Sequence, residues 1–324
     1  RSGERICSMS IIKRVALTGC GGLYGQAVLR EIRQNHPHIH VLGLDVGTDF
    51  PIEPDVFCHC DIREQQATQS IIDYAPDAII HLAYSVQPNR HQKHMQSVNI
   101  DGTRAVLTAA SVCQPKQLLV ASSGTVYGAR SSAPAAYTED TPISPNTHYY
   151  YSRDKGVVES DVASFAKNHD NIAVALTRPA IICSPQAKNF LLDIFLTVPF
   201  LVLPSGNDTP LQFIHADDVA RGTMAILMHA GRGPFNLTPE DFVTQTQLAR
   251  TMGIPAIQMP SFILRSIAWL WWTLHLPWVS VPPGLVSYVC HPWLMTGARL
   301  QTECGFYCKK SSAEAFSTIL KHHQ

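Results

Sequence analysis

The sequence predicts an α/β fold, a doubly wound parallel sheet with helices on both faces and a smaller C-terminal region beside it. In the first half, short runs rich in β-branched residues alternate with longer segments of helical periodicity, which is typical of βαβ units. A glycine-rich turn connects the first of these strands to the first helix. After about Pro179 the alternation gives way to apolar, proline-rich segments, so we expect a different architecture there.

The predicted strands and helices follow this alternation along the chain. The strands are expected at Lys13–Thr18, His40–Leu44, Val56–Cys60, Ala78–Leu82, Gln117–Ala121 and Ile172–Thr177. The helices are expected near Leu23–Arg33, Arg63–Tyr74, His91–Ser111 and Tyr150–Lys167. Because crossovers between parallel strands are right-handed, this order predicts a Rossmann-type sheet covered by helices on both faces.

A chain of 324 residues is about twice the usual domain length, so it can hold one large domain or a core domain with a smaller partner. We expect residues 9–183 to form the Rossmann domain, with 213–238 returning to it. Residues 184–212 and 239–324 are expected to form a smaller, substrate-binding region. Residues 1–8 lack the apolar stretch of a secretory signal and are expected to be a leader outside the fold.

The composition excludes several classes of partner. Lys plus Arg equals Asp plus Glu at 25 each, without a long run of one sign, so we expect a small-molecule substrate and no nucleic acid. Nine cysteines without a CxxC pair do not predict a disulfide framework and favour a cytoplasmic location. Cys58 and Cys60 flank His59 but lack a second ligand pair, and the other histidines are scattered, so no metal is expected.

The glycine-rich turn predicts a phosphate-binding loop. In VALTGCGGLYGQAVL, Gly19, Gly22 and Gly25 lead from a strand directly into a helix, whose N-terminus carries a partial positive charge. Asp45 ends the next strand, where its carboxylate can accept hydrogen bonds from a ribose diol. Because that carboxylate would repel a 2′-phosphate, the pattern predicts NAD rather than NADP. For the glycine motif by itself, an ordinary βα turn is the alternative.

Three consecutive tyrosines precede a lysine in THYYYSRDKGVVE, and the spacing selects one of them. Tyr151 and Lys155 lie four residues apart in a helical segment and therefore share one face. An ammonium group near the phenol is expected to lower the pKa of Tyr151, so that it can act as a general base. In LLVASSGTVYG, Ser123 follows a strand and can hold a substrate oxygen near Tyr151. Tyr149 and Tyr150 are expected to line a pocket or to pack at the start of the helix.

These segments resemble, in their order, those of extended short-chain dehydrogenases/reductases of the NAD-dependent epimerase/dehydratase group. The resemblance includes the TGxxGxxG start, CDIRE, HLAY, NIDGT, SSGTVYG, YxxxK, TRPAII and FIHADDVA. It extends over roughly Lys13 to Leu237, and TGARLQTECGFYCKKSSAEAF looks like the closing segment of the group. The resemblance implies an NAD-dependent enzyme with a Rossmann fold.

The resemblance also implies a role for each matching residue. Tyr151 would be the acid or base, Lys155 would bind the nicotinamide ribose, and Ser123 would hydrogen-bond the reacting oxygen. Asp61 with Ile62 would contact the adenine. The expected cofactor-binding residues are Gly19, Gly22, Leu23, Tyr24, Gly25, Asp45, Asp61, Ile62, Leu82, Ala83, Asn99, Ser122, Tyr151, Lys155, Arg178, Pro179 and Ile181. The expected substrate-contacting residues are Tyr84, Ser85, Gly124, Thr125, Gln212 and Arg299.

Departures from the family pattern bear on the substrate. Dehydratases of the group have an Asp-Glu pair after the catalytic hydroxyl, but Gly124 and Thr125 stand here, so dehydration is not expected. Gln212 stands where many sugar-nucleotide enzymes place an arginine for the diphosphate, and Arg299 remains as a candidate. We expect a nucleotide-sugar 4-epimerase-like enzyme. The alternatives are a dehydrogenase or reductase of a sterol-like or lipid alcohol, and an NAD-binding sensor without turnover.

A tryptophan-rich segment and the oligomeric state complete the expectations. In residues 261–278, Trp269, Trp271 and Trp272 with their apolar neighbours cover nearly every face of a helix, which fits burial or peripheral contact with a membrane. Burial is favoured, because a helix on a membrane surface normally has a strongly charged opposite face. The resemblance implies a homodimer, since most of the group pair through a helix bundle that includes the YxxxK helix.

Overall fold

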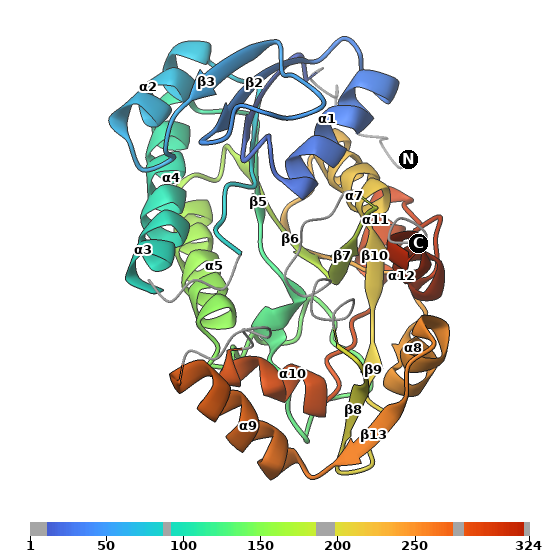
Figure 1. Cartoon of the computed structure of the whole chain (residues 1–324). Coiled ribbons are helices and arrows are strands. Elements are labelled where there is room, and N and C mark those ends of the chain that lie inside the picture. The colour runs from blue at the N-terminus through green and yellow to red at the C-terminus, as the bar shows by residue number, and fades with distance from the viewer. Residues whose placement is uncertain (1–11, 87–91, 186–197, 275–281, 321–324) are drawn as a thin grey trace, which may run out of the picture.

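The computed structural model describes residues 12–86, 92–185, 198–274 and 282–320. Its centre is a seven-stranded parallel sheet in the order β11-β6-β5-β4-β1-β2-β3 (Figure 1). The strands are β1 Arg14–Thr18, β2 His40–Asp45, β3 Val56–His59, β4 Ala78–His81, β5 Gln117–Ala121, β6 Ala173–Pro179 and β11 Gly233–Leu237. The chain builds outward from β1 through β3 and then, from β4, in the opposite direction. The doubly wound sheet predicted from the sequence is therefore confirmed.

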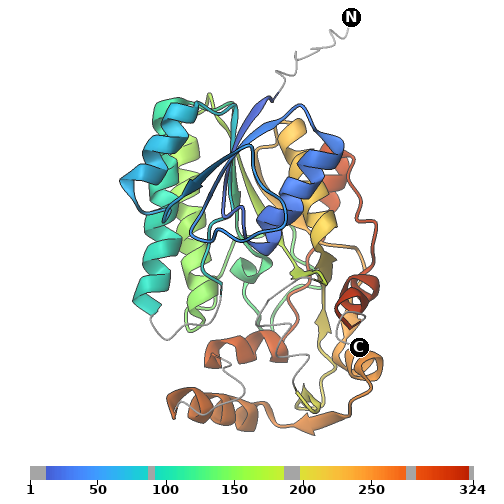
Figure 2. The ribbon, with the colours of Figure 1, turned by 45° about the horizontal axis from the view of Figure 1, so that its top comes forward.

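Helices cover both faces of this sheet. Figure 2 shows α2, α4 and α5 on one side and α1 with α7 on the other. Their bounds are α1 Leu23–Asn35, α2 Gln65–Tyr74, α4 Gly102–Cys113, α5 Tyr150–Asn168 and α7 Ala216–Met228. Because the strands are covered on both faces, β1, β4, β5 and β6 are mostly apolar and almost wholly buried, as expected for a parallel sheet.

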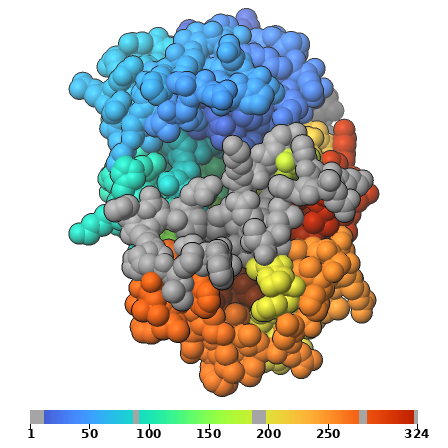
Figure 3. Space-filling model, in the orientation of Figure 1, coloured from blue at the N-terminus to red at the C-terminus, as the bar shows by residue number. Residues whose placement is uncertain are grey.

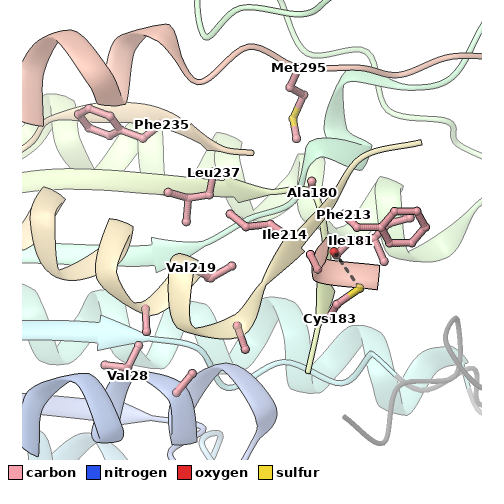
Figure 4. Close-up of a cluster of buried hydrophobic side chains, with 14 of the residues drawn as sticks. Val28, Ala180, Ile181, Cys183, Phe213, Ile214, Val219, Phe235, Leu237 and Met295 are labelled. Carbon is pink, nitrogen blue, oxygen red and sulfur yellow. Dashed lines mark hydrogen bonds between the residues drawn. The ribbon is translucent and has the colours of Figure 1, made fainter. Parts of the chain in front are cut away.

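The segment 213–238 returns to the sheet through a buried apolar cluster (Figure 4). Phe213 and Val219 of the returning segment point into this cluster, and Val28 of α1 packs against it. The strand β10, Phe213–His215, pairs in parallel with β7, Ile181–Cys183. Side chains from α1 and from the returning segment, far apart in the sequence, thus share one core.

The segment predicted as one helix, His91–Ser111, is interrupted. It contains α3 Gln92–Gln96, a π-helical turn at Ser97–Asp101 and then α4. The turn carries Asn99, whose carbonyl oxygen accepts a hydrogen bond from Thr103 Oγ1 at 2.7 Å. A π-helical turn inserts extra backbone into a helix and is frequent at functional sites.

A second layer lies beyond the carboxyl ends of the strands (Figures 1 and 2). Within it β8 pairs in parallel with β13, and β9 pairs antiparallel with β12. Its elements are β8 Leu201–Pro204, β9 Pro210–Leu211, β12 Val243–Thr244, α8 Gln245–Met252, β13 Ala256–Met259, α9 Ser261–Thr273, a 3₁₀ turn at Pro283–Leu285 and α10 Val286–Cys290.

The last two helices return to the Rossmann part of the chain. The helix α11, Ala298–Cys304, contacts β11 and α7, and α12, Ser312–Leu320, contacts β10. The division of the chain into two regions stays a prediction, and the expected leader, residues 1–8, lies outside the described residues.

The helix α9 is largely exposed, so the favoured expectation of burial is wrong for the described part of residues 261–278. Only Ala268 of this helix is buried, while the side chains of Phe262 and Trp269 are 69% and 59% exposed. Sequence periodicity missed this because an apolar helix in a core and an apolar helix over a cavity have the same composition.

No helix in the described ranges has the length and hydropathy of a membrane span. Peripheral membrane contact stays a prediction that flotation with liposomes would check.

Candidate active site

A cavity of about 230 Å³, the first cavity, opens at the carboxyl ends of the central strands. Strand order reverses there between β1 and β4, the position at which doubly wound sheets bind ligands. It brings together residues of motifs that lie far apart in the sequence. The residues predicted from the sequence that line it are Gly19, Gly22, Leu23, Tyr24, Gly25, Leu82, Tyr84, Ser122, Ser123, Thr125, Tyr151, Lys155, Pro179 and Ile181.

Two glycines in the turn between β1 and α1 permit a close approach of backbone segments. Gly19 has a φ of +70°, and a Cβ atom there would lie 2.7 Å from the backbone nitrogen of Ala83. A Cβ atom on Gly25 would overlap the carbonyl oxygen of Gly19. Gly22, the N-cap of α1, provides no side-chain cap, so the N–H groups of the first turn can bind an anion. The turn therefore fits the pyrophosphate of a dinucleotide.

Asp45 is held beside this turn by two backbone hydrogen bonds. Its Oδ2 accepts one from the N–H of Gly21 at 2.8 Å, and its Oδ1 accepts one from the N–H of Gly47 at 2.9 Å. Its carboxylate still has acceptor capacity for a diol and would repel a phosphate group. Asp45 does not itself line the first cavity, so its contact with a ribose stays a prediction.

Asp61 and Ile62, predicted to contact an adenine, follow β3. Arg63 donates to the two carboxylate oxygens of Asp61 at 2.9 and 2.6 Å, and this hydrogen-bonded ion pair holds the pKa of Asp61 below its usual value. Ile62 is buried and packs against Gly102. Neither residue lines the first cavity.

Ser123 and Tyr151 both line the first cavity. Ser123 follows β5, and Tyr151 lies in the first turn of α5. The Ser123 Oγ accepts hydrogen bonds from the backbone N–H of Thr125 at 3.2 Å and from its hydroxyl at 3.1 Å. This leaves the Ser123 proton to be donated to the Tyr151 oxygen.

The amino group of Lys155 is buried between the backbone of Ala121 and the ring of Tyr84. Its Nζ donates a hydrogen bond to the carbonyl oxygen of Ala121 at 2.6 Å. The same atom lies 3.4 Å from the ring centroid of Tyr84 and 6.0 Å from that of Tyr151. Burial lowers the pKa of Lys155 to about 7, and the carboxylate of Glu159 opposes this shift. Lys155 can therefore gain or lose a proton near neutral pH.

The pKa of Tyr151 moves in the direction opposite to the sequence prediction. Burial raises it above the usual value, although the hydrogen bond from Ser123 lowers it. The prediction assumed that a charged Lys155 would stabilise the phenolate. In the structure burial disfavours the charged form of Lys155 as well, so the desolvation of the phenolate prevails.

Replacing Lys155 by methionine should stabilise the cofactor-free protein at pH 6, and this advantage should shrink as the pH rises. The pKa of Lys155 is about 7 in the folded protein, against 10.5 for an exposed lysine, so the unfolded chain binds the extra proton between these values. Wild-type stability therefore rises across this window by at most about 1.4 kcal/mol per pH unit, and the variant lacks this slope. Urea unfolding from pH 6 to 10 measures it.

The control for this experiment is Lys167→Met, which removes an exposed lysine from the same helix. It should keep the wild-type slope. If Lys155→Met also keeps that slope, the charged form of Lys155 is not disfavoured in the folded protein.

A buried ion pair lies next to the site and joins α5 to β6. Arg178 donates to the two carboxylate oxygens of Glu159 at 2.9 and 2.6 Å, and to the hydroxyl of Tyr127 at 2.7 Å. The hydroxyl of Ser122 also donates to Glu159, at 2.5 Å. Arg178 was predicted as a cofactor-binding residue, but it does not line the first cavity. Arg178 connects β6 to the helix of Tyr151, and Ser122, after β5, is bound to the same Glu159 carboxylate.

Asn99, Ser85 and Gly124 also lie outside the lining of the first cavity. The side-chain oxygen of Asn99 accepts a hydrogen bond from the N–H of Ser85 at 2.8 Å. This bond holds the loop after β4, which carries Tyr84. A Cβ atom on Gly124 would clash with the sulfur of Met295, so the absence of a side chain there allows the C-terminal region to approach.

Gln212 and Arg299, the candidates for a diphosphate, are engaged in other contacts. The Nε2 of Gln212 donates to the carbonyl oxygens of Pro239 at 3.1 Å and Met295 at 2.9 Å. Arg299 donates to the carbonyl oxygen of Pro234 at 3.0 Å and is part of α11. Both hold C-terminal segments against the sheet, and neither lines a described cavity.

A second cavity, of about 560 Å³, adjoins the first. The two cavities share Thr125, Tyr149, Ile181 and Trp293 as lining residues. Tyr150, in contrast, is buried in the core. Sequence reasoning missed Trp293, because it lies in a C-terminal segment that matched no motif.

Comparisons with known proteins place the chain in a family. The sequence model of the NAD dependent epimerase/dehydratase family matches residues 15–238. The chain is 23% identical over 261 residues to the uncharacterized protein y4nG of Sinorhizobium fredii. That alignment covers 76% of this chain and 61% of y4nG, so the chain spans less than two thirds of the length of this relative.

Solved structures share the fold. A UDP-glucose 4-epimerase of Thermotoga maritima, crystallised with UDP-glucose, is similar with a TM-score of 0.72 and 16% identity, over 96% of this chain and 98% of that one. A UDP-glucose 4-epimerase of Thermus thermophilus in complex with NAD is similar with a TM-score of 0.74 and 17% identity, over 95% and 98% of the two chains. At these identities the likeness establishes the fold and not the substrate.

Proposed function

The chain belongs to the NAD-dependent epimerase/dehydratase family of enzymes, and we propose that it transfers a hydride between NAD and the carbon of a secondary alcohol, with Tyr151 as the acid or base. The observation that carries this proposal is the convergence of Ser123, Tyr151 and Lys155 on one cavity beside the glycine turn. The family is NAD-dependent. When bound, NAD supplies the acceptor and donor of the hydride.

The residues of this chain fit an NAD cofactor in three respects. A Cβ atom on Gly19 or Gly25 would collide with neighbouring backbone, so the two glycines allow the tight turn between β1 and α1 that would hold a pyrophosphate. The first turn of α1 presents N–H groups without a side-chain cap. Asp45 presents a carboxylate at the end of β2 that would accept hydrogen bonds from the adenosine ribose. Lys155 would hold the nicotinamide ribose.

The proton of the substrate hydroxyl would pass to and from the Tyr151 oxygen. In the oxidative direction Tyr151 accepts this proton as the phenolate, after its own proton has left to solvent, and in the reductive direction the phenol returns it. Ser123, oriented by the two hydrogen bonds from Thr125, donates to the reacting oxygen or to Tyr151. Because burial raises the pKa of Tyr151 in the cofactor-free protein, the resting state is the phenol, ready to act as an acid.

Two reactions of this site are proposed and differ in their products. A nucleotide-sugar 4-epimerase would return the hydride to the opposite face of the sugar, as expected for a relative of the UDP-glucose 4-epimerases. A dehydrogenase of an apolar alcohol would release a ketone and NADH. Incubation with NAD and either UDP-glucose or a hydroxysteroid distinguishes them, because only the second reaction accumulates NADH. A sensor without turnover would give neither product.

Replacing Asp45 by serine should shift the cofactor preference from NAD towards NADP. The change removes the carboxylate that would bind the ribose diol and repel a 2′-phosphate, so the ratio of the dissociation constants for NADP and NAD should fall by about tenfold or more. Titration calorimetry with both cofactors measures this ratio. Asp49→Ser removes the same charge from the exposed loop after β2 and should leave the ratio unchanged.

The oligomeric state and the location of the protein in the cell also stay proposals. A homodimer formed through α5, and a cytoplasmic location, both follow from the family resemblance and the cysteine content alone. Sedimentation equilibrium would test the dimer.

A further inference from the structure

The second cavity shares several lining residues with the first cavity, which holds the reaction site. Tyr149 and Trp293 line both cavities, and Thr125, which orients Ser123, also borders both. A molecule with one end beside Ser123 and Tyr151 can therefore extend into the second cavity. In Figure 1 the elements that surround it, β8, α9 and α10, lie beyond the carboxyl ends of the sheet strands.

The walls of the second cavity are apolar. They are formed mainly by side chains of the β8 segment and of α9 and α10, namely Val198, Pro199, Phe200, Leu201, Val202, Leu264, Ile267, Ala268, Trp271, Val286 and Val289. Among the described residues that line it there is no Asp, Glu, Lys, Arg or His. A diphosphate or a sugar would lose its hydration here without compensation. The volume of about 560 Å³ lies within the range of roughly 300–1,000 Å³ that accommodates drug-sized ligands.

Two buried polar atoms in this lining have no hydrogen-bond partner in the described protein. They are Nε1 of Trp293 and Oε1 of Gln245, in residues that are 8% and 3% exposed. The Gln245 amide is oriented by its Nε2, which donates to the carbonyl oxygen of Val289 at 2.9 Å. The hydroxyl of Tyr288, in contrast, is already hydrogen-bonded to the carbonyl of Thr125. An unpaired buried donor and acceptor cost free energy, so a ligand with matching groups would be favoured.

We propose that the second cavity binds the body of the substrate, an apolar secondary alcohol with a further hydroxyl group at its far end. The reacting hydroxyl meets Ser123 and Tyr151, the far hydroxyl donates to Oε1 of Gln245, and Trp293 donates to an oxygen of the substrate. The inference rests on the proposed function. For the oxidation, Tyr151 first releases its own phenolic proton to solvent. The carbon then loses a hydride to NAD, which becomes NADH, the hydroxyl proton passes to the Tyr151 phenolate, and the alcohol becomes a ketone.

The test uses 2-butanol, 2-octanol and 2-dodecanol with saturating NAD, and follows NADH by absorbance. For the wild-type protein kcat/KM should rise about threefold to fourfold with each added methylene group until the cavity is filled. Ala268→Phe places a bulky ring in the cavity and should remove most of this rise. Ser266→Phe adds the same ring to an exposed position of the same helix and should leave the rise intact.

A diol tests the role of Gln245. Dodecane-2,11-diol should have a KM about tenfold lower than that of 2-dodecanol, the gain of one hydrogen bond to a buried acceptor. Gln245→Met keeps the length of the side chain but should abolish this preference. Equal KM values for the two alcohols in the wild-type protein would contradict the hydrogen bond to Gln245.

A binding measurement separates this inference from the proposed function. Tyr151→Phe should still bind 2-dodecanol, seen as a change in tryptophan fluorescence, and adding Ala268→Phe should weaken that binding at least tenfold. Turnover of UDP-glucose that depends on Tyr151 but not on Ala268, without binding of the alcohols, would overturn the inference and leave the proposed function standing. Binding that Ala268→Phe abolishes, without turnover of any alcohol or UDP-sugar, would support the assigned cavity and contradict the proposed function.

Discussion

Replacing Tyr151 by phenylalanine should lower kcat by about 10²–10⁴-fold, the contribution typical of a positioned general acid or base. The change removes one oxygen, the atom that would exchange a proton with the substrate hydroxyl. It leaves the ring, which packs against Tyr84 and Tyr149. The dissociation constant for NAD should therefore change little. Turnover and NAD binding, measured on the same preparation, check both expectations.

The neighbouring residue supplies a matched control. Tyr150→Phe removes a hydroxyl that is buried and has no hydrogen-bond partner in the described part of the chain. Turnover should be unchanged, and stability should be equal or higher, because an unsatisfied polar group leaves the core. If Tyr150→Phe abolished turnover and Tyr151→Phe did not, the assignment based on the spacing to Lys155 would be wrong.

Replacing Glu159 by glutamine should lower the free energy of unfolding by about 3–5 kcal/mol, because it leaves the charge of Arg178 buried without its partner. The side chains of Glu159 and Arg178 are 4% and 5% exposed, so water cannot replace the lost interaction. The pair connects α5 to β6, and Ser122 donates to the same carboxylate. Denaturation by urea at pH 7 measures the change.

An exposed ion pair between α4 and the same helix α5 is the control. Arg104 donates to Asp161 at 2.8 Å, but its side chain is 56% exposed. Asp161→Asn should cost at most about 1 kcal/mol, because solvent screens such pairs. Equal effects of the two substitutions would mean that burial does not govern the strength of the Glu159 pair.

Much of the fold follows from local sequence patterns. The strand β5 begins and ends where the sequence predicts, at Gln117 and Ala121, because residues 118–121 are all apolar and polar turns flank the strand. The strand β6 continues to Pro179, two residues beyond its predicted end, since Pro179 lies opposite Leu237 of β11. The partner strand lies far along the chain, and no local pattern indicates where pairing with it ends.

In the candidate site, too, local patterns predicted some residues, and only the packing of distant segments revealed the others. The motifs identified Ser123, Tyr151 and Lys155, because a short spacing on a helix and a serine at a strand end are local features. They did not identify Trp293 or Gln245, which enter the cavities only through the packing of the C-terminal region. They also placed Arg178 with the cofactor, whereas its guanidinium is buried against Glu159.

The sequence by itself determined the class of fold and the family, and it singled out Tyr151 and Lys155 as candidates for the reaction, because periodicity, turn glycines and helical spacing act over a few residues. Only the tertiary structure decided that burial raises the pKa of Tyr151, that α9 is exposed on one side, and that a large apolar cavity adjoins the reaction site. The physical reason is that desolvation and cavity shape depend on groups brought together from distant parts of the chain.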